Sequence, residues 1–130
     1  MMQPVYLHPE GEYVLRITDW EKRPLLSGEG YRIVFSTEVV EYVGPGVPDP
    51  ALAVRCCVLL TEKGWWHVRK LFYACATGHP GNDPCFGNLV GRIFAASVRH
   101  KPGPWYVVCH ERRVGEPELP NQAFIDDVAP

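Results

Sequence analysis

Apolar and polar residues alternate along two stretches of the chain, and each stretch predicts a β-strand. In residues 11–20 and in residues 31–42, apolar side chains occupy nearly every second position, the period of a strand with one buried face. The second stretch is rich in aromatic and β-branched residues, which favour strands. Pro24 and a Ser-Gly-Glu-Gly cluster predict a long loop over residues 19–30. The side chains expected to face the core are Tyr13, Leu15, Ile17, Tyr31, Ile33, Phe35, Thr37 and Val39.

Three later stretches also predict strands. Residues 53–60 form a short, nearly continuous apolar run, typical of a central strand or a buried helix turn, and its brevity and flanking breakers favour the strand. Alternation resumes at Leu89 and predicts a fourth strand that ends near Arg99. Residues 105–113 predict a fifth strand. We expect the last two strands to pair as a hairpin, since only about four to six residues separate them.

Residues 61–78 show helical rather than strand spacing. Thr61 is placed to cap the first turn with its hydroxyl, and Gly78 is placed to end the helix because glycine tolerates a left-handed turn. The apolar residues share one broad face, which we expect to pack against the strands. This face consists of Trp65, Val68, Leu71, Phe72, Cys75 and Ala76.

The order of the elements predicts the fold class. Three strands, one helix and two strands are the order of the five-stranded OB-like barrel, in which the helix covers an open end. We therefore expect a mostly β protein with one helix, and the alternative is a generic α+β sheet with a helix on one face. Residues 1–130 are expected to form one domain, with residues 1–10 as a lead-in and residues 114–130 as a proline-punctuated acidic tail. Phe124, Ile125 and Val128 are candidates to dock this tail as an edge strand.

Charge and composition restrict the partners and the compartment. The chain has 130 residues and a formal net charge of -2, so a nucleic-acid contact needs a local basic surface rather than overall positive charge. No run of about eighteen apolar residues predicts a membrane span, and no apolar leader follows the first residues. We therefore expect a cytoplasmic protein that does not contact membranes. The 5 cysteines include no CxxC pair, which favours reduced structural thiols; they are Cys56, Cys57, Cys75, Cys85 and Cys109.

Several scaffold positions together resemble a known family. They are Gly11 and Tyr13 before the first strand, the Gly-rich residues 27–31, Gly78 after the helix, residues 89–92, and Asn121, Asp126, Asp127 and Pro130 at the close. In this pattern the chain resembles a family of small phage and prophage proteins that look like single-stranded DNA-binding proteins of OB type, long catalogued as a domain of unknown function. The resemblance implies an OB fold, binding of single-stranded DNA in phage or prophage replication or recombination, and a host-cell cytoplasmic location. It implies no individual contact residue, and the implied partners are replication or recombination proteins.

Basic residues adjoin tryptophans in two predicted loops, independently of that resemblance. One loop joins Trp20 to Lys22 and Arg23, and the other joins Arg99 and Lys101 to Trp105. In an OB barrel these two loops flank the binding face, so we expect them to face each other across one groove. Single strands are held by cations along the phosphates and by rings that stack on bases. The expected floor of the groove is Arg16, Arg32, Arg55 and Arg92. The alternative is that both loops are solvated turns with incidental tryptophans.

The predicted helix carries a second candidate surface opposite its apolar face. Trp66, Lys70 and Tyr73 are spaced by four and three residues and share that side. This patch predicts self-association as a homo-oligomer or docking of another protein, and the alternative is that its rings fold onto neighbouring loops. A protein-protein interaction module on an OB-like barrel is therefore the second function that the sequence supports.

Motifs for enzymatic chemistry are missing from the sequence. It contains no Walker loop, no GxSxG elbow and no HExxH motif, so we expect no catalytic residues and no cofactor. The residues that come nearest to a metal set are Cys75, His79, Cys85, Cys109 and His110, whose spacing matches no common zinc pattern. We expect no metal site, and a metal-dependent nucleic-acid-processing enzyme is the weakest of the three functions considered.

Overall fold

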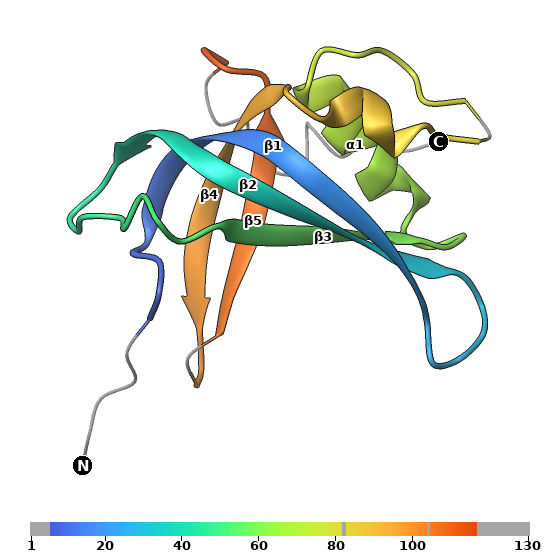
Figure 1. The fold of residues 1–130 in the computed structure, drawn as a ribbon, viewed down its shortest axis with the longest axis horizontal. Helices are drawn as coiled ribbons and strands as arrows, with labels where there is room; N and C mark the ends of the chain where they lie inside the picture. The colour runs from blue at the N-terminus through green and yellow to red at the C-terminus, as the bar shows by residue number, and fades with distance from the viewer. Residues whose placement is uncertain (1–5, 82, 104, 117–130) are drawn as a thin grey trace.

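Five antiparallel strands and one helix make up the fold (Figure 1), seen in a computed structural model that describes residues 6–81, 83–103 and 105–116. The strands form one sheet in the order β3-β2-β1-β4-β5. The elements are β1 (Gly11–Pro24), β2 (Tyr31–Val43), β3 (Val54–Leu60), α1 (Trp65–Ala74), the 3-10 helix η1 (Phe86–Leu89), β4 (Ile93–Lys101) and β5 (Trp105–Arg112). The prediction of a mostly β protein with one helix is confirmed. The predicted tail strand with Phe124, Ile125 and Val128 lies outside the described residues.

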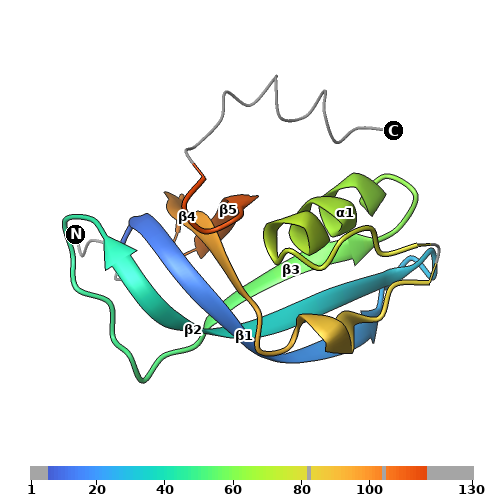
Figure 2. The same cartoon turned by 90° about the horizontal axis from the view of Figure 1, so that it is seen from above.

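The sheet does not close into a barrel, which corrects part of the prediction. Its two edge strands are β3 and β5, and among the described residues no ladder joins them. Instead α1 packs against both strands, and Figure 2 shows this helix lying above β3. The helix therefore contacts both edge strands of the open sheet.

The alternation of apolar and polar residues in β1 and β2 correctly predicted which side of the sheet faces the core. The buried side chains of β1 include Tyr13, Leu15 and Ile17, and those of β2 include Ile33 and Phe35, all in one hydrophobic cluster with residues of β4, α1 and η1. Thr37 is also buried, and its hydroxyl donates to the carbonyl oxygen of Val54 over 2.7 Å. Two residues expected on this side are less covered: Val39 is half-buried and Tyr31 is 41% exposed.

Strand β1 is longer than predicted and extends to Pro24. The ladder to β2 shifts register between Ile17 and Asp19, so Thr18 is an extra residue and the sides of the strand change there. Pairing then continues to the last pair, Pro24 with Tyr31. Residues 19–24 are therefore strand rather than loop. Most of their side chains are exposed, so this part of the strand shows no apolar alternation in the sequence.

The helix is shorter than the predicted stretch 61–78. Thr61 accepts a hydrogen bond from the amide of Gly64 over 3.0 Å, which caps the turn before α1 rather than the helix itself. The chain leaves the helix at Ala76, whose φ of 58° is left-handed, so Gly78 lies beyond the end. Val68, Leu71, Phe72 and Cys75 are buried as predicted, Trp65 is half-buried, and Ala76 is exposed, contrary to prediction.

The fourth strand begins later than its apolar pattern suggests. Leu89 is fully buried but belongs to η1, and β4 starts at Ile93. Between them Gly91 has a φ of 87°, a left-handed conformation that suits glycine, and its amide donates to the carbonyl of Ile17 over 2.7 Å. Leu89 therefore fills the core from a 3-10 turn. Within the described residues, no helix combines the length and the apolar character needed to cross a membrane.

Candidate nucleic-acid interface

Arginines gather on the outer side of β1, β2 and β3, a surface that we call the arginine face. Arg23 is paired across the ladder with Arg32, and Arg32 with Leu59. Arg55 is paired with Ser36, which lies on the same side of β2 as Arg32 because side chains alternate. The β2 residues that point the other way are buried in the core. The ladder therefore places Arg23, Arg32 and Arg55 on one solvent-facing surface.

The charges of the arginine face are only partly balanced. Arg23 donates to Glu21 over 2.8 Å, and this hydrogen bond lowers the pKa of the Glu21 carboxyl, with a smaller effect of the Arg55 charge. Arg23 and Arg32 stand directly opposite each other, and like charges in that position repel. A bound anion would offset this repulsion, so the face is suited to phosphate groups.

A tyrosine bridges the seam between β3 and β5. The hydroxyl oxygen of Tyr106 accepts from the amide of Arg55 over 2.9 Å, and the same hydroxyl donates to the carbonyl of Arg55 over 3.1 Å. This bridge holds β5 within one tyrosine side chain of the edge of β3. Trp105 and Val107, the neighbours of Tyr106, project to the opposite side of β5 and therefore outward.

Trp105 is the most exposed aromatic ring on this outer surface. Its exposed fraction is 70%, and it is paired with Lys101 across the β4-β5 ladder, so a cation adjoins the ring. The indole rests on the turn between the strands: a Cβ added to Gly103, whose φ is 77°, would lie 3.1 Å from Cδ1 of Trp105. The ring is thus supported by the turn and open to solvent, as a base-stacking platform requires.

Arg99 takes part in a polar network centred on Glu12. The Glu12 carboxylate accepts from Ser97 over 2.6 Å, from Arg112 over 3.0 Å and from Arg99 over 3.0 Å. Burial alone would raise the pKa of Glu12, but these hydrogen bonds hold it below its ordinary value. Arg99 therefore lies next to Lys101 on the outer side, with its charge compensated by Glu12.

The other tryptophan-basic stretch is not placed as predicted. Trp20 is half-buried on the inner side of β1 and packs against Phe86 of η1, with ring centroids 5.6 Å apart. Lys22 is paired with buried Ile33 and lies with its Nζ 4.1 Å from the ring centroid of Tyr31. Of this stretch, Arg23 alone belongs to the arginine face.

The two tryptophan-basic stretches also do not face each other across a groove. The ladder between β4 and β1 covers Gly11–Arg16 of β1. About eight further residues of β1, or roughly 26 Å, separate that ladder from Pro24. In Figure 1 the β1-β2 connection lies at the lower right, well apart from the lower ends of β4 and β5.

The two remaining floor residues differ in position. Arg16 lies on the same outer side of β1 and β2, opposite Glu38, and forms an ion pair with that carboxylate over 2.8 Å. Arg92 lines a different hollow, of about 470 Å³, together with Arg113 and the residues that follow α1. Arg16, Arg32 and Arg55 therefore lie on the outer side of the sheet, and Glu38 balances the charge of Arg16.

The helix patch is tied into contacts within the protein. Trp66 is 39% exposed and stacks on His67. Lys70 lies 3.3 Å from the buried carboxylate of Glu111, and its Nζ is 5.8 Å from the Trp66 ring centroid. Tyr73 carries the guanidinium of Arg113 over its ring at 4.1 Å and donates to Glu116 over 3.0 Å. Trp66 is the most exposed part of this patch, and self-association through it remains a prediction.

Sequence reasoning missed three contributors to this region. Tyr106 was part of a predicted strand without a role, while Leu59, 40% exposed, and Val107, 36% exposed, add apolar surface beside the cations. Outward apolar residues on strands that otherwise alternate could have indicated a contact surface. The Tyr106 bridge gave no such signal, since Arg55 is 51 residues away.

Cys75 is buried and Cys56 and Cys109 are half-buried, and none of these three cysteines provides a reactive thiolate. Burial raises the pKa of Cys75 to about 12 and also raises those of Cys56 and Cys109. These thiols stay protonated near neutral pH and behave as small apolar side chains. In the described part of the chain, no three His, Cys, Asp or Glu side chains are grouped to hold a metal ion.

No protein-family model matches this sequence, and no curated protein matches it either.

Proposed function

We propose that this protein is a non-enzymatic, sequence-tolerant single-stranded DNA-binding protein that uses the arginine face and Trp105. The observation that carries the proposal is the Tyr106 bridge, because it ties β5, which carries the exposed indole of Trp105, to Arg55 of the arginine face. Cations spaced along strands suit the phosphates of an extended chain. A ring that is open to solvent suits stacking on an unpaired base, at roughly 1 to 3 kcal/mol per base.

We also propose that the fold is OB-like. The observed order β3-β2-β1-β4-β5, with the helix between β3 and β4, is the arrangement expected of a five-stranded, partly open OB barrel. On this interpretation the seam between β3 and β5 is the opening, which α1 and the Tyr106 hydroxyl cover in place of a ladder. In OB folds the face of the second and third strands binds oligonucleotides. The arginine face occupies that position.

A single strand fits this surface better than a duplex does. In a duplex the bases are stacked on each other, so a ring such as Trp105 cannot reach a base face without disrupting the pairs. The net charge of -2 is compatible with such a site, because the ladders bring Arg23, Arg32 and Arg55 together on one face.

The biological setting is part of the proposal. The resemblance to phage and prophage proteins favours protection of single strands during replication or recombination, with proteins of those processes as partners. The interaction-module alternative has less surface to support it, because Lys70 and Tyr73 already contact Glu111 and Glu116.

Fluorescence anisotropy with labelled oligothymidine tests this function. We expect oligothymidine of about 15 nucleotides to bind more tightly than a duplex of equal length, with affinity that falls steeply as salt rises, because bound phosphates release counterions. The Arg32→Ala/Arg55→Ala double variant should bind weakly, while the matched Arg92→Ala/Arg113→Ala control, whose two side chains line the other hollow, should bind like the parent. Equal affinity for duplex, or equal losses in both double variants, would refute the proposal.

A further inference from the structure

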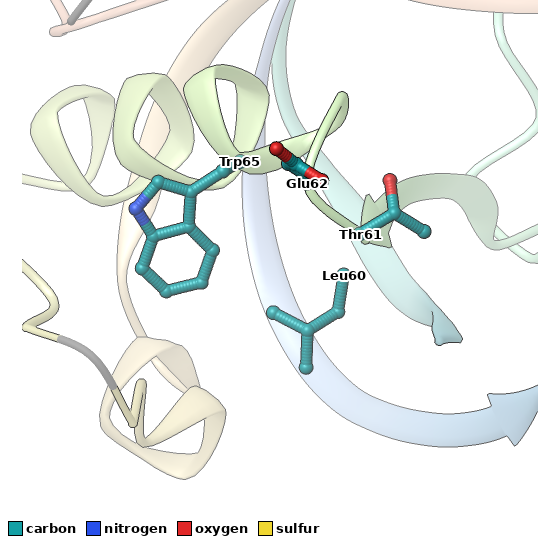
Figure 3. A pocket seen from close by; sticks show the side chains of 4 residues that line it. All are labelled: Leu60, Thr61, Glu62 and Trp65. Atoms are coloured by element: carbon teal, nitrogen blue, oxygen red, sulfur yellow. The ribbon is translucent and has the colours of Figure 1, made fainter. Parts of the chain in front are cut away.

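A hollow of about 420 Å³ lies where the end of β3 meets the start of α1, lined by Leu60, Thr61, Glu62 and Trp65 (Figure 3). Its size falls within the roughly 300 to 1,000 Å³ of small-molecule sites, and such sites combine apolar walls with a few polar groups. Here Leu60 and Trp65 supply the apolar walls, and Figure 3 shows their side chains extending from β3 and α1 toward the same space.

The hollow lies at the end of β3 where the last row of the arginine face ends. Leu59 is exposed on that face beside Arg32, its ladder partner. Leu60, the next residue, points to the other side of β3 and lines the hollow. The hollow therefore opens one residue beyond the last row of the arginine face, and a strand lying on that face can direct one base over the edge of β3.

We propose that this hollow holds one unpaired nucleobase that carries an amino group, with guanine as the best occupant. The inference rests on the proposed single-strand function and adds a base preference to it. Most of the bound strand is held without regard to sequence, and one position is read.

The lining favours a base over a phosphate. The carboxylate of Glu62 repels phosphate but accepts hydrogen bonds from N-H donors, and an unstacked base presents its Watson-Crick edge for such contacts. Guanine offers two adjacent donors, N1-H and N2-H, that match two carboxylate oxygens. Cytosine offers one amino group, whereas thymine presents two carbonyl oxygens that the carboxylate disfavours.

The remaining lining groups are consistent with the same occupant. The indole of Trp65 provides a ring on which a base can stack. Thr61 already accepts from the amide of Gly64 over 3.0 Å, so its hydroxyl proton can be directed to a base carbonyl such as O6 of guanine. Thr61 and Glu62 thus add a donor and an acceptor to an otherwise apolar lining.

Three labelled oligonucleotides test the inference with the full chain: oligothymidine, and the same sequence with one central dG or one central dC. The parent should bind the dG oligonucleotide about five- to tenfold more tightly than oligothymidine, with dC between them, since a good bidentate contact gives discrimination of this order. Glu62→Gln should reduce the dG preference to less than about twofold, and any change in oligothymidine affinity should be a gain, because the carboxylate that disfavours thymine is removed. Glu29→Gln, an exposed acid in the β1-β2 connection, is the matched control and should keep the preference.

Trp65→Phe keeps a ring and should retain most of the preference, whereas Trp65→Leu should lose it. If the parent binds all three oligonucleotides alike, or if the preference survives Glu62→Gln, the base site is overturned and the arginine face stands. If oligothymidine does not bind at all, the proposed function fails, and this inference fails with it.

Discussion

The Tyr106→Phe variant, which lacks the hydroxyl, tests most directly whether that group holds β5 close to β3. The hydroxyl makes two hydrogen bonds to the backbone of Arg55, at 2.9 and 3.1 Å, and both are lost in the variant. At about 0.5 to 1.5 kcal/mol for each hydrogen bond, the free energy of unfolding should fall by roughly 1 to 2 kcal/mol, given that water can replace part of the bonding. The ring itself is kept, so its edge contact with His8 at 5.0 Å remains.

Urea denaturation and oligothymidine binding should be measured on the same variant. We expect affinity to fall about threefold or more, because β5 and Trp105 are then less firmly positioned beside Arg55. Tyr31→Phe is the matched control: this ring is 41% exposed, so its free energy of unfolding should change by less than about 0.5 kcal/mol. Unchanged stability in Tyr106→Phe would show that α1 alone holds the seam and would refute the bridging role.

Three further outcomes are expected. Trp105→Ala should weaken oligothymidine binding by about 1 to 3 kcal/mol with little change in salt slope. Trp20→Ala should mainly lower stability in a thermal melt, because that ring packs on η1. The reverse pattern would contradict the assignment of Trp105 to the binding surface and of Trp20 to the core. In a salt titration, Arg55→Ala should reduce the slope of log affinity against log salt by about 0.7, the contribution of one phosphate on a single strand; an unchanged slope would remove Arg55 from the interface. Burial alone would raise the pKa of Glu111, but the hydrogen bond and charge of His67 and the charge of Lys70 hold it below its ordinary value of 4.5. The ionised Glu111 carboxylate therefore stabilises the folded state above about pH 4.5, and this contribution is lost as pH falls through the lowered pKa. Glu111→Gln should flatten the acid limb of stability measured by urea denaturation between pH 5 and pH 3, and a limb as steep as the parent's would exclude Glu111 as its source.

Strand and helix identity could be predicted because the core imposes a period on the sequence. Tyr13, Leu15 and Ile17 alternate since each must reach the same buried side, and Val68, Leu71 and Phe72 recur at helical spacing for the same reason. The boundaries were less predictable where local signals competed. Ala76 adopts the left-handed conformation that Gly78 was expected to supply, and no propensity indicates this.

The candidate site could be predicted only in part, because sidedness is lost at a bulge. The extra residue Thr18 exchanges the two sides of β1, which directs Trp20 inward and Arg23 outward. A run of polar residues has no apolar pattern from which this exchange can be read. The pairing of Arg55 with Tyr106 was equally inaccessible, since it depends on how two distant strands approach each other.

The turn beneath Trp105 reduces the side-chain entropy that the indole can lose when a base stacks on it. An exposed indole on a mobile loop would lose its rotational freedom only when a base stacks on it, at about 0.5 to 1.5 kcal/mol for such a side chain. Here the ring already rests on Gly103, so part of that entropy is lost when the chain folds rather than when a base stacks on the ring. Folding therefore prepares the platform in advance, and a larger share of the stacking energy remains available as affinity.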